Sequence, residues 1–193
     1  MPEIYEFGFE AEVPYKFPWN KFVVLHDTYY QQGLDFLKSF QGYDNYEILG
    51  VEEKFNIDID DWQFVGIIDL LFKDENGRLI IRDYKSKASF KNDIEKSEYA
   101  RQLYLYSLYV KEKYGKYPDA LQFLMFRKNT LVEIPFNEED CESAVDWAKT
   151  TVRIIRAAFD YPPTCDQFYG ENLCNFRETC ELKPKPQRRN RKR

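Results

Sequence analysis

Three consecutive runs rich in β-branched and aromatic residues place the strongest constraint on the fold. They cover residues 47–59, 63–72 and 78–85, and polar turns separate them. Runs of this kind predict neighbouring β-strands. The third run, RLIIRDYK, begins like a buried strand and ends with Asp83 and Lys85. Packing alone would exclude opposite charges from the interior of a sheet, so this strand end needs another explanation.

The patterns on either side of these runs complete an α/β arrangement. Before the runs, the pattern predicts a helix over 18–42 that starts near Pro18 and stops at Gly42. After the runs, it predicts in order a helix over 92–114, strands at 120–126 and 130–136, and a helix capped by Asn137. This order predicts a mixed β-sheet flanked by α-helices. A length of 193 residues suits one domain, which we place at residues 1–182.

The turn between the second and third runs decides whether two acids face each other. A two-residue loop at Asn76–Gly77 would place Asp69 and Asp83 on opposite faces of the sheet. A three-residue loop with a left-handed Gly77 pairs residue 74 with residue 78 and sets Asp69 opposite Asp83. We expect the three-residue loop, because Asp-Glu-Asn-Gly suits a type I turn closed by glycine.

A facing pair of carboxylates predicts a metal site. Two such groups, about 5 Å apart between Cβ atoms, repel each other unless a cation lies between them. Oxygen ligands without a cluster of Cys or His favour Mg²⁺ or Mn²⁺. Lys85 lies about 6–7 Å further along the same strand face, within reach of a water or phosphate beside that metal. Acid, metal and lysine together suit phosphoryl transfer.

An ordinary salt-bridged strand end is the alternative explanation. Asp83 would then pair with Lys85 or Arg82 at a sheet edge, with no chemistry attached. A D-x-K tripeptide is too short to distinguish these two explanations without its sequence context.

That context resembles the PD-(D/E)XK nuclease superfamily, in particular its RecB-type branch of CRISPR-associated and phage-encoded exonucleases. The matching motifs are G-x-x-D at Gly66 and Asp69, D-x-K at Asp83 and Lys85, and Q-x-x-x-Y at Gln102 and Tyr106. The resemblance implies a restriction-endonuclease-like fold and a metal-dependent nuclease.

The resemblance also implies roles for individual residues. It assigns catalysis to Asp69, Asp83, Lys85, Gln102 and Tyr106, and metal binding to His26, Asp69, Asp83 and the backbone carbonyl of Tyr84. His26 is the only histidine of the chain. A family glutamate on the preceding strand corresponds to either Glu52 or Glu53.

Iron–sulfur members of this branch carry a C-terminal C-x2-C-x5-C motif. Here Cys174 and Cys180 match its last pair, but Glu171 stands where the first cysteine belongs. Cys165 offers a substitute, and no cysteine precedes His26 to complete a set of four. Cys141 belongs to an apolar helical stripe that continues to Phe159, so we expect it in the core. We therefore favour packing over an iron–sulfur cluster or zinc at Cys165, Cys174 and Cys180.

Charge is distributed unevenly along the chain. Residues 183–193 hold seven of the 28 basic residues and no acid, which leaves 21 basic against 33 acidic residues elsewhere. We expect this segment to be a disordered tail that contacts DNA through Arg188, Arg189, Arg191, Lys192 and Arg193, although a solvated linker has the same composition. The sequence shows neither a signal pattern nor a long apolar window, so we expect an intracellular protein.

The functional hypothesis is a deoxyribonuclease that uses Mg²⁺ or Mn²⁺ and acts as an exonuclease on DNA ends in DNA processing, recombination or repair. Its partners would be single- or double-stranded DNA and, for processivity, either further copies of the chain or a replication or recombination protein. A nucleic-acid-binding or assembly subunit that keeps the fold without catalysis is one alternative. A structure-specific endonuclease with the same core is another.

Overall fold

The computed structural model describes residues 2–13, 17, 19, 21–40, 42–160, 174, 176 and 179. The chain divides into two compact units, residues 1–151 and 152–193, with the boundary inside the last helix. The sheet and the expected catalytic residues belong to the first unit. No helix among the described ranges is both long enough and apolar enough to cross a membrane. The domain boundary expected at residue 182 stays a prediction.

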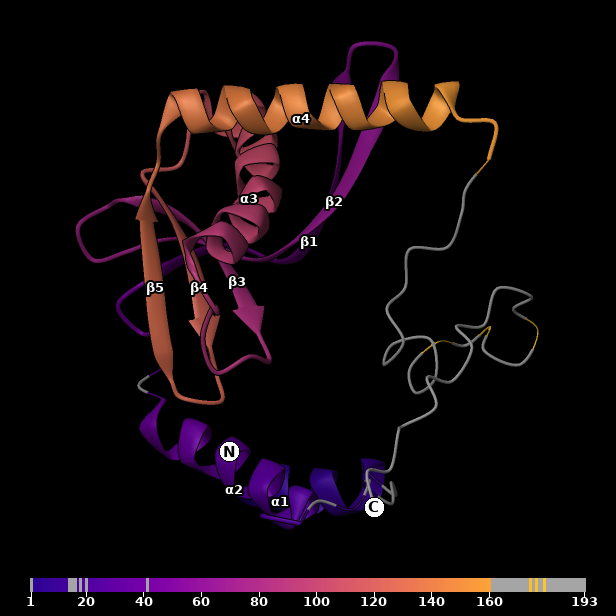
Figure 1. Cartoon of the computed structure of the whole chain (residues 1–193). Helices are drawn as coiled ribbons and strands as arrows, with labels where there is room; N and C mark the ends of the chain where they lie inside the picture. Colours follow the sequence, from indigo (N-terminus) through magenta and orange to yellow (C-terminus); the bar gives the residue numbers. More distant parts are fainter. Residues whose placement is uncertain are drawn as a thin grey trace. The chain divides into compact units, whose positions relative to one another are not determined.

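A five-stranded mixed sheet forms the centre of the first unit (Figure 1). The strands are β1 (Glu47–Ile59), β2 (Trp62–Lys73), β3 (Leu79–Lys85), β4 (Ala120–Met125) and β5 (Thr130–Pro135), and they lie in the order β1-β2-β3-β4-β5. The helices are α1 (Pro2–Glu12), α2 (Leu25–Ser39), α3 (Asp93–Tyr114) and α4 (Glu138–Ala157). The predicted restriction-endonuclease-like class, a mixed sheet flanked by helices, is confirmed.

The β2–β3 turn has the three-residue form that the sequence favours. Lys73 pairs with Leu79, the Asp74 N–H donates to the Arg78 carbonyl at 3.1 Å, and Gly77 adopts φ +74°. The Asp74 carboxylate accepts hydrogen bonds from the Asn76 and Arg78 amides at 3.0 and 2.9 Å. These contacts fix the turn, and the turn then determines which residues of β2 and β3 lie opposite each other.

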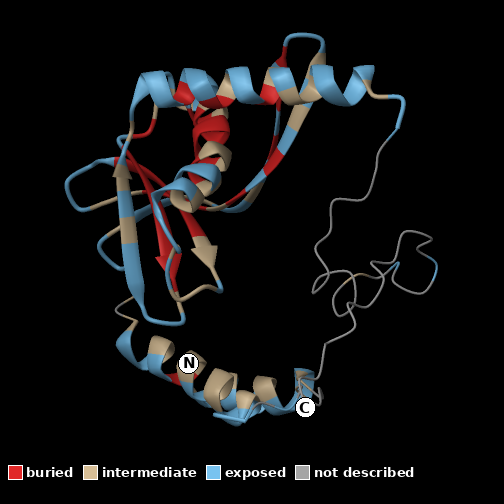
Figure 2. Ribbon diagram, in the orientation of Figure 1, coloured by how far each residue is buried: buried red, intermediate tan, exposed pale blue. Residues whose placement is uncertain are grey.

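Helix α3 provides the crossover that makes β3 and β4 a parallel pair. Asn92 caps its start by accepting a 2.9 Å hydrogen bond from the Glu95 amide, and Gly115 ends it in the left-handed region at φ +75°. Its buried side packs on the sheet, and the core residues include Leu79, Ile81, Leu103, Val110, Leu121 and Phe123. Figure 2 shows this burial concentrated in α3, β3 and β4.

Two helical details differ from the sequence predictions. Helix α1 was not expected, and the helix expected over 18–42 occupies only Leu25–Ser39, while Pro18 lies outside the described residues. Asn137 caps α4 as predicted, by accepting a 3.1 Å hydrogen bond from the Asp140 amide. The apolar stripe of α4 is buried at Cys141, Ala144 and Ala148 but exposed at its far end. The predicted burial of Cys141 in the core is therefore confirmed.

Candidate active site

Asp69 and Asp83 face each other where β2 and β3 separate. The last ladder pair is Leu70 with Arg82, and one further step in this register places Asp69 across from Asp83. Beyond the Leu70–Arg82 pair, β2 and β3 are no longer paired in the ladder. Instead, the Asp69 Oδ2 atom accepts a 2.8 Å hydrogen bond from the Tyr84 backbone amide. The side chain of Asp69 thus occupies the gap at the point where the ladder ends.

Asp83 and Lys85 form a buried ion pair on the α3 side of the sheet. Lys85 Nζ lies 2.7 Å from Asp83 Oδ2, and the two side chains are 17% and 6% exposed. The ammonium group also lies over the rings of Tyr99 and Phe123, 5.1 and 5.8 Å from their centroids. The predicted grouping of Asp69, Asp83 and Lys85 is therefore present in the structure.

The surroundings of Asp83 disfavour its negative charge. Burial raises the pKa of the Asp83 carboxyl above its ordinary value, and Asp69 raises it further, whereas Lys85 opposes both effects. Although Lys85 is within ion-pair distance, Asp83 Oδ2 receives no hydrogen bond of normal geometry from any described residue. A buried carboxylate oxygen in this state suits a cation ligand, so Asp69 and Asp83 fit a divalent metal. The Tyr84 carbonyl stays a predicted third ligand.

Gly66 and the pair Gln102–Tyr106 shape the wall beside these acids. A Cβ atom at Gly66 would clash with the Phe55 ring and lie 2.8 Å from Tyr106 Cε1, so only glycine leaves room for both rings over β2. Gln102 Nε2 donates a 2.5 Å hydrogen bond to Tyr106 Oη, and the Tyr106 ring is buried against Phe55 with centroids 5.2 Å apart. The structure brings Gln102 and Tyr106 together, as their spacing predicts.

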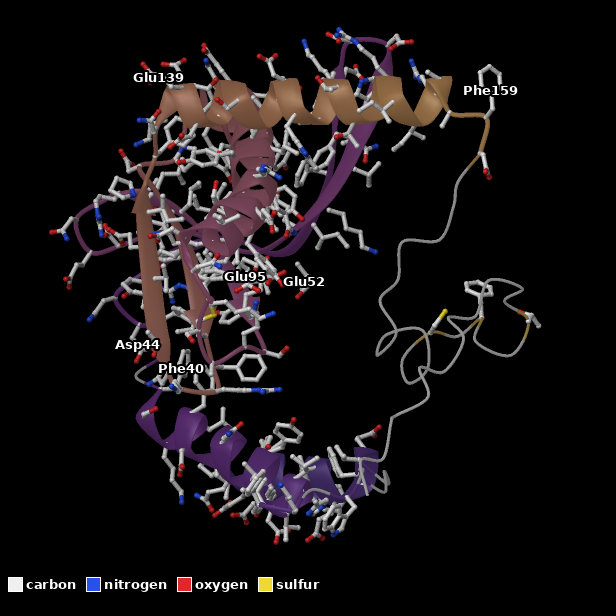
Figure 3. All side chains as sticks on the ribbon, viewed as in Figure 1. Phe40, Asp44, Glu52, Glu95, Glu139 and Phe159 are labelled. Atoms are coloured by element: carbon white, nitrogen blue, oxygen red, sulfur yellow. The ribbon has the colours of Figure 1, made fainter. Side chains whose placement is uncertain are left out.

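The two candidate glutamates of β1 occupy different environments. The ladder pairs Val51–Leu70 and Glu53–Ile68 place Glu52 across from Asp69. Glu52 has the left-handed φ of +49° and an exposed side chain (labelled in Figure 3).

Glu53 instead turns toward α3, where it accepts hydrogen bonds from Tyr109 and Lys113. Burial alone would raise the pKa of Glu53, but these hydrogen bonds outweigh burial and hold the pKa below its ordinary value. Glu53 therefore stabilises the contact between β1 and α3.

The structure does not bring His26 to the carboxylates. Its Nδ1 atom lies 3.0 Å from Asp27 Oδ1, its ring packs edge-on against Phe9 and Phe17, and its side chain is 46% exposed. Within the described ranges, no three His, Cys, Asp or Glu side chains form a group able to hold a metal ion. The expected ligand set of His26, Asp69 and Asp83 is thus reduced to the two aspartates, because α2 places the histidine elsewhere.

Among the cysteines, Cys141 occupies the core position that the sequence predicts. Cys141 is buried and its Sγ donates to the Tyr104 carbonyl at 3.4 Å, while burial raises the pKa of its thiol to about 11. Cys174 is a free thiol. Cys165 and Cys180 lie outside the described residues, as do the expected DNA contacts Arg188, Arg189, Arg191, Lys192 and Arg193.

Two residues near the site correct or extend the sequence analysis. Arg82 was a candidate salt-bridge partner for Asp83, but it points to the opposite face and donates to Gln122 Oε1 at 2.8 and 2.6 Å. Tyr99 was missed, although its ring underlies both Lys85 and Lys87, with Lys87 Nζ 4.8 Å from the centroid. Its position three residues before Gln102 on the same helix face was the available signal.

The comparisons with known proteins agree with this geometry. The family model of the PD-(D/E)XK nuclease superfamily matches residues 25–181. The chain belongs to the PD-(D/E)XK nuclease superfamily. The catalytic roles of Asp69, Asp83 and Lys85 within this superfamily stay predictions.

Comparisons beyond the PD-(D/E)XK family model add little. No curated protein sequence matches the chain. Among solved structures, the crystal structure of SSO0001 is similar, with a TM-score of 0.41 and 15% sequence identity over 94% of this chain and 96% of that one. At this TM-score the similarity supports no conclusion about fold or function.

Proposed function

We propose that the protein is a metal-dependent deoxyribonuclease that cleaves phosphodiester bonds from DNA ends. The observation that carries the proposal is the facing pair Asp69–Asp83 with Lys85 on the same side of the sheet. The family assignment supports metal-dependent nuclease chemistry. The restriction to DNA, the exonuclease mode and a role in DNA processing, recombination or repair are our proposals.

The proposed mechanism gives each residue a defined task. Asp69, Asp83 and the Tyr84 carbonyl would hold one or two Mg²⁺ or Mn²⁺ ions, which polarise the scissile phosphate and lower the pKa of an attacking water. The Tyr84 amide holds the Asp69 carboxylate in place through its 2.8 Å hydrogen bond. Lys85 orients the water or stabilises the charge that develops on the phosphate. Gln102 and Tyr106 orient the strand or the metal ligands from α3.

A non-catalytic nucleic-acid-binding subunit is the second candidate. It is favoured by the absence, within the described part of the chain, of any three-residue metal-binding group. The buried and charge-strained Asp83 argues against it, because nucleic-acid binding does not require two facing acids.

The test compares cleavage by wild type, Asp83→Asn and Lys85→Ala. End-labelled linear DNA and closed circular DNA are incubated with Mg²⁺ or Mn²⁺ and the products are resolved by electrophoresis. We expect the wild type to degrade linear DNA and both variants to lose at least about 100-fold in rate. The matched control is Lys73→Ala, an exposed lysine of the same hairpin that pairs with Glu47.

The readouts separate the competing functions. Equal cleavage by wild type and both variants would refute the assigned residues, and cleavage of closed circles would refute a strict exonuclease. Binding of DNA without any cleavage would support the second candidate. A thermal shift with Mn²⁺ in the wild type that Asp83→Asn lacks would support metal binding independently of activity.

A further inference from the structure

A hollow of about 450 Å³ lies beside the strand end that carries the acids. It is bounded by α1, α2, the turn after β4 and Ser86, which directly follows Lys85. The Phe126 amide, on the same wall, donates a 3.2 Å hydrogen bond to the Lys85 carbonyl. In Figure 1 the arrowheads of β3 and β4 point toward α1 and α2. The hollow therefore lies at the carboxyl ends of the parallel strands, the usual place for ligands in open α/β sheets.

The walls of this hollow include five aromatic side chains. Tyr29 and Phe36 of α2 and Phe126 are three of them, and the Phe36 and Phe126 rings contact each other in a tilted arrangement with their centroids 6.1 Å apart. Aromatic faces of this kind stack nucleic-acid bases without regard to sequence. Gln32 adds a polar atom, since its buried Oε1 has no hydrogen-bond partner among the described residues. Every nucleobase carries an N–H group that could donate to this oxygen.

A second hollow of about 440 Å³ adjoins the first and shares Gln32, Phe36, Phe126 and Arg127 with it. Its remaining wall is polar, with Lys128, Asn129, Ser39 and Asp35. Arg127 lines both hollows, and its guanidinium lies over the Tyr29 ring of the aromatic one, 4.9 Å from the centroid. The two hollows match the two parts of a nucleotide. The aromatic hollow suits the flat base, and the polar hollow with its two cations suits the charged phosphate backbone.

We propose that the aromatic hollow binds one unpaired base of a nucleic-acid strand whose backbone passes Arg127 and Lys128 and reaches Lys85. The proposal rests on the nuclease function proposed above and adds its substrate class, a strand with at least one unpaired nucleotide next to the cleavage site. A paired base cannot enter, because both of its faces are stacked and its edge is occupied.

The test measures binding without cleavage. Fluorescently labelled single-stranded oligonucleotides, each with one abasic residue at a different position, are titrated with the wild-type protein in excess chelator. We expect one position at which loss of the base weakens binding by about tenfold, within the roughly 5- to 150-fold range known for stacking of a single base. The other positions should change binding by less than about twofold. Fully paired duplex should compete poorly.

Variants of the lining provide the second arm. Phe36→Ala removes a stacking face, and Gln32→Leu removes the unpaired acceptor while keeping the size of the side chain. Both should weaken binding of the intact oligonucleotide and abolish the effect of the sensitive abasic position. Gln31→Leu is the matched control, because Gln31 is exposed on the same helix and its amide donates to Asp35 at 2.7 Å, while its side chain is not among those that line the two hollows. Circular dichroism confirms that each variant is folded.

The outcomes distinguish this proposal from the nuclease function. Equal binding of all abasic oligonucleotides by the wild type would overturn the base pocket and leave the cleavage test untouched. Loss of self-association in Phe36→Ala, measured by sedimentation velocity, without any change in oligonucleotide binding, would also overturn it and assign the hollow to a second copy of the chain. Failure of the wild type to bind or cut any nucleic acid would instead refute the proposed function.

Discussion

Asp83 carries a charge that its surroundings oppose. The residue is only 5% exposed, and burial together with Asp69 raises the pKa of its carboxyl above the ordinary value despite the nearby lysine. Such a residue lowers the stability of the metal-free protein at neutral pH and recovers that loss when a cation binds. Catalytic groups are often buried charges of this kind, because the arrangement that serves catalysis lowers the stability of the folded protein.

The pKa of Asp83 predicts how its replacement changes stability with pH. Because the folded pKa lies above the ordinary value of 3.8, the native state holds this proton more tightly than the unfolded state. The resulting stability is present below pH 3.8 and is lost as the pH rises through the folded pKa. In chelator, the stability of Asp83→Asn relative to wild type should therefore increase between about pH 3.5 and about pH 7, because only the wild type loses this contribution as the pH rises. Urea unfolding of both proteins at the two pH values measures the difference, and a difference that stays constant or moves the other way would contradict the prediction.

Gly66 offers a second prediction for a single residue. Gly66→Ala should lower the free energy of unfolding by about 1–3 kcal/mol, because the added Cβ would clash with the Phe55 ring and approach the Tyr106 ring to 2.8 Å. Gly8→Ala in α1 is the matched control, since a Cβ there meets nothing within 4 Å. The control should be neutral or stabilising by up to about 1 kcal/mol. Chemical denaturation of both variants measures the difference, and equal effects would refute the packing argument.

At the scale of elements, the β2–β3 hairpin determines the site. Its turn fixes which residues face each other, and β3 then delivers Asp83 and Lys85 to the α3 side. A register shifted by one residue would move Asp83 to the face that Arg82 and Tyr84 now occupy. The left-handed Gly77 therefore helps to set Asp69 opposite Asp83.

Gly77→Ala tests that statement. A residue with a Cβ at φ +74° should cost about 1–2 kcal/mol, and Gly77→Asn should cost less, because Asn tolerates this conformation. Gly115→Ala, at φ +75° in the cap of α3, should cost a similar amount. Only the change at Gly77 should reduce hydrogen-exchange protection of the Tyr84 amide relative to the rest of the sheet. Equal loss of protection in both alanine variants would show that the turn does not control the site.

The sequence predicted the elements that local chemistry specifies. The strand runs, the cap residue Asn137 and the three-residue turn were correct, because each depends on residues close together in the chain. The Asp69–Asp83 pairing followed from the turn alone. Lys85 was placed correctly because side chains alternate along a strand.

The expectations that the structure does not reproduce depend on contacts between distant residues. The position of His26 follows from the packing of α2 on Phe9 and Phe17, which no local pattern specifies. The β-bulge between Ile48 and Gly50 and the positive φ of Glu52 turn neighbouring glutamates in different directions, so sequence could not choose between them. The mostly exposed helix α1, with no buried residue, lacks the strong apolar stripe that would have revealed it.

For the whole molecule, charge should govern how nucleic acid binds. The residues before 183 carry an excess of acids, so we expect the seven basic residues of 183–193 to supply a large share of any attraction to phosphates. Removing residues 183–193 should weaken DNA binding and flatten its salt dependence, with the slope falling by about 0.7–0.9 for each phosphate that the tail neutralises. Titrations from low to high salt measure this slope.

The control for the tail keeps its length. Changing Arg188, Arg189, Arg191, Lys192 and Arg193 to Gln should reproduce the effect of the deletion, while Mn²⁺ binding at the acids should persist in both proteins. An unchanged salt slope after either change would make the tail a simple linker.

The short loop of the β2–β3 hairpin also bears on how quickly the site forms. Asp69 and Asp83 are joined by a hairpin that closes locally, whereas β3 reaches β4 only after the whole of α3 has been traversed. Local contacts form early because little chain entropy is lost in closing them, and parallel pairs with long connections form late. We therefore expect the two acids to meet before the sheet is complete, while water still screens their repulsion. Asp83 would then become buried, and its pKa would rise, only when α3 finally docks on the sheet. A metal ion present at that step should speed folding, because it would offset the repulsion between the two acids as water leaves them.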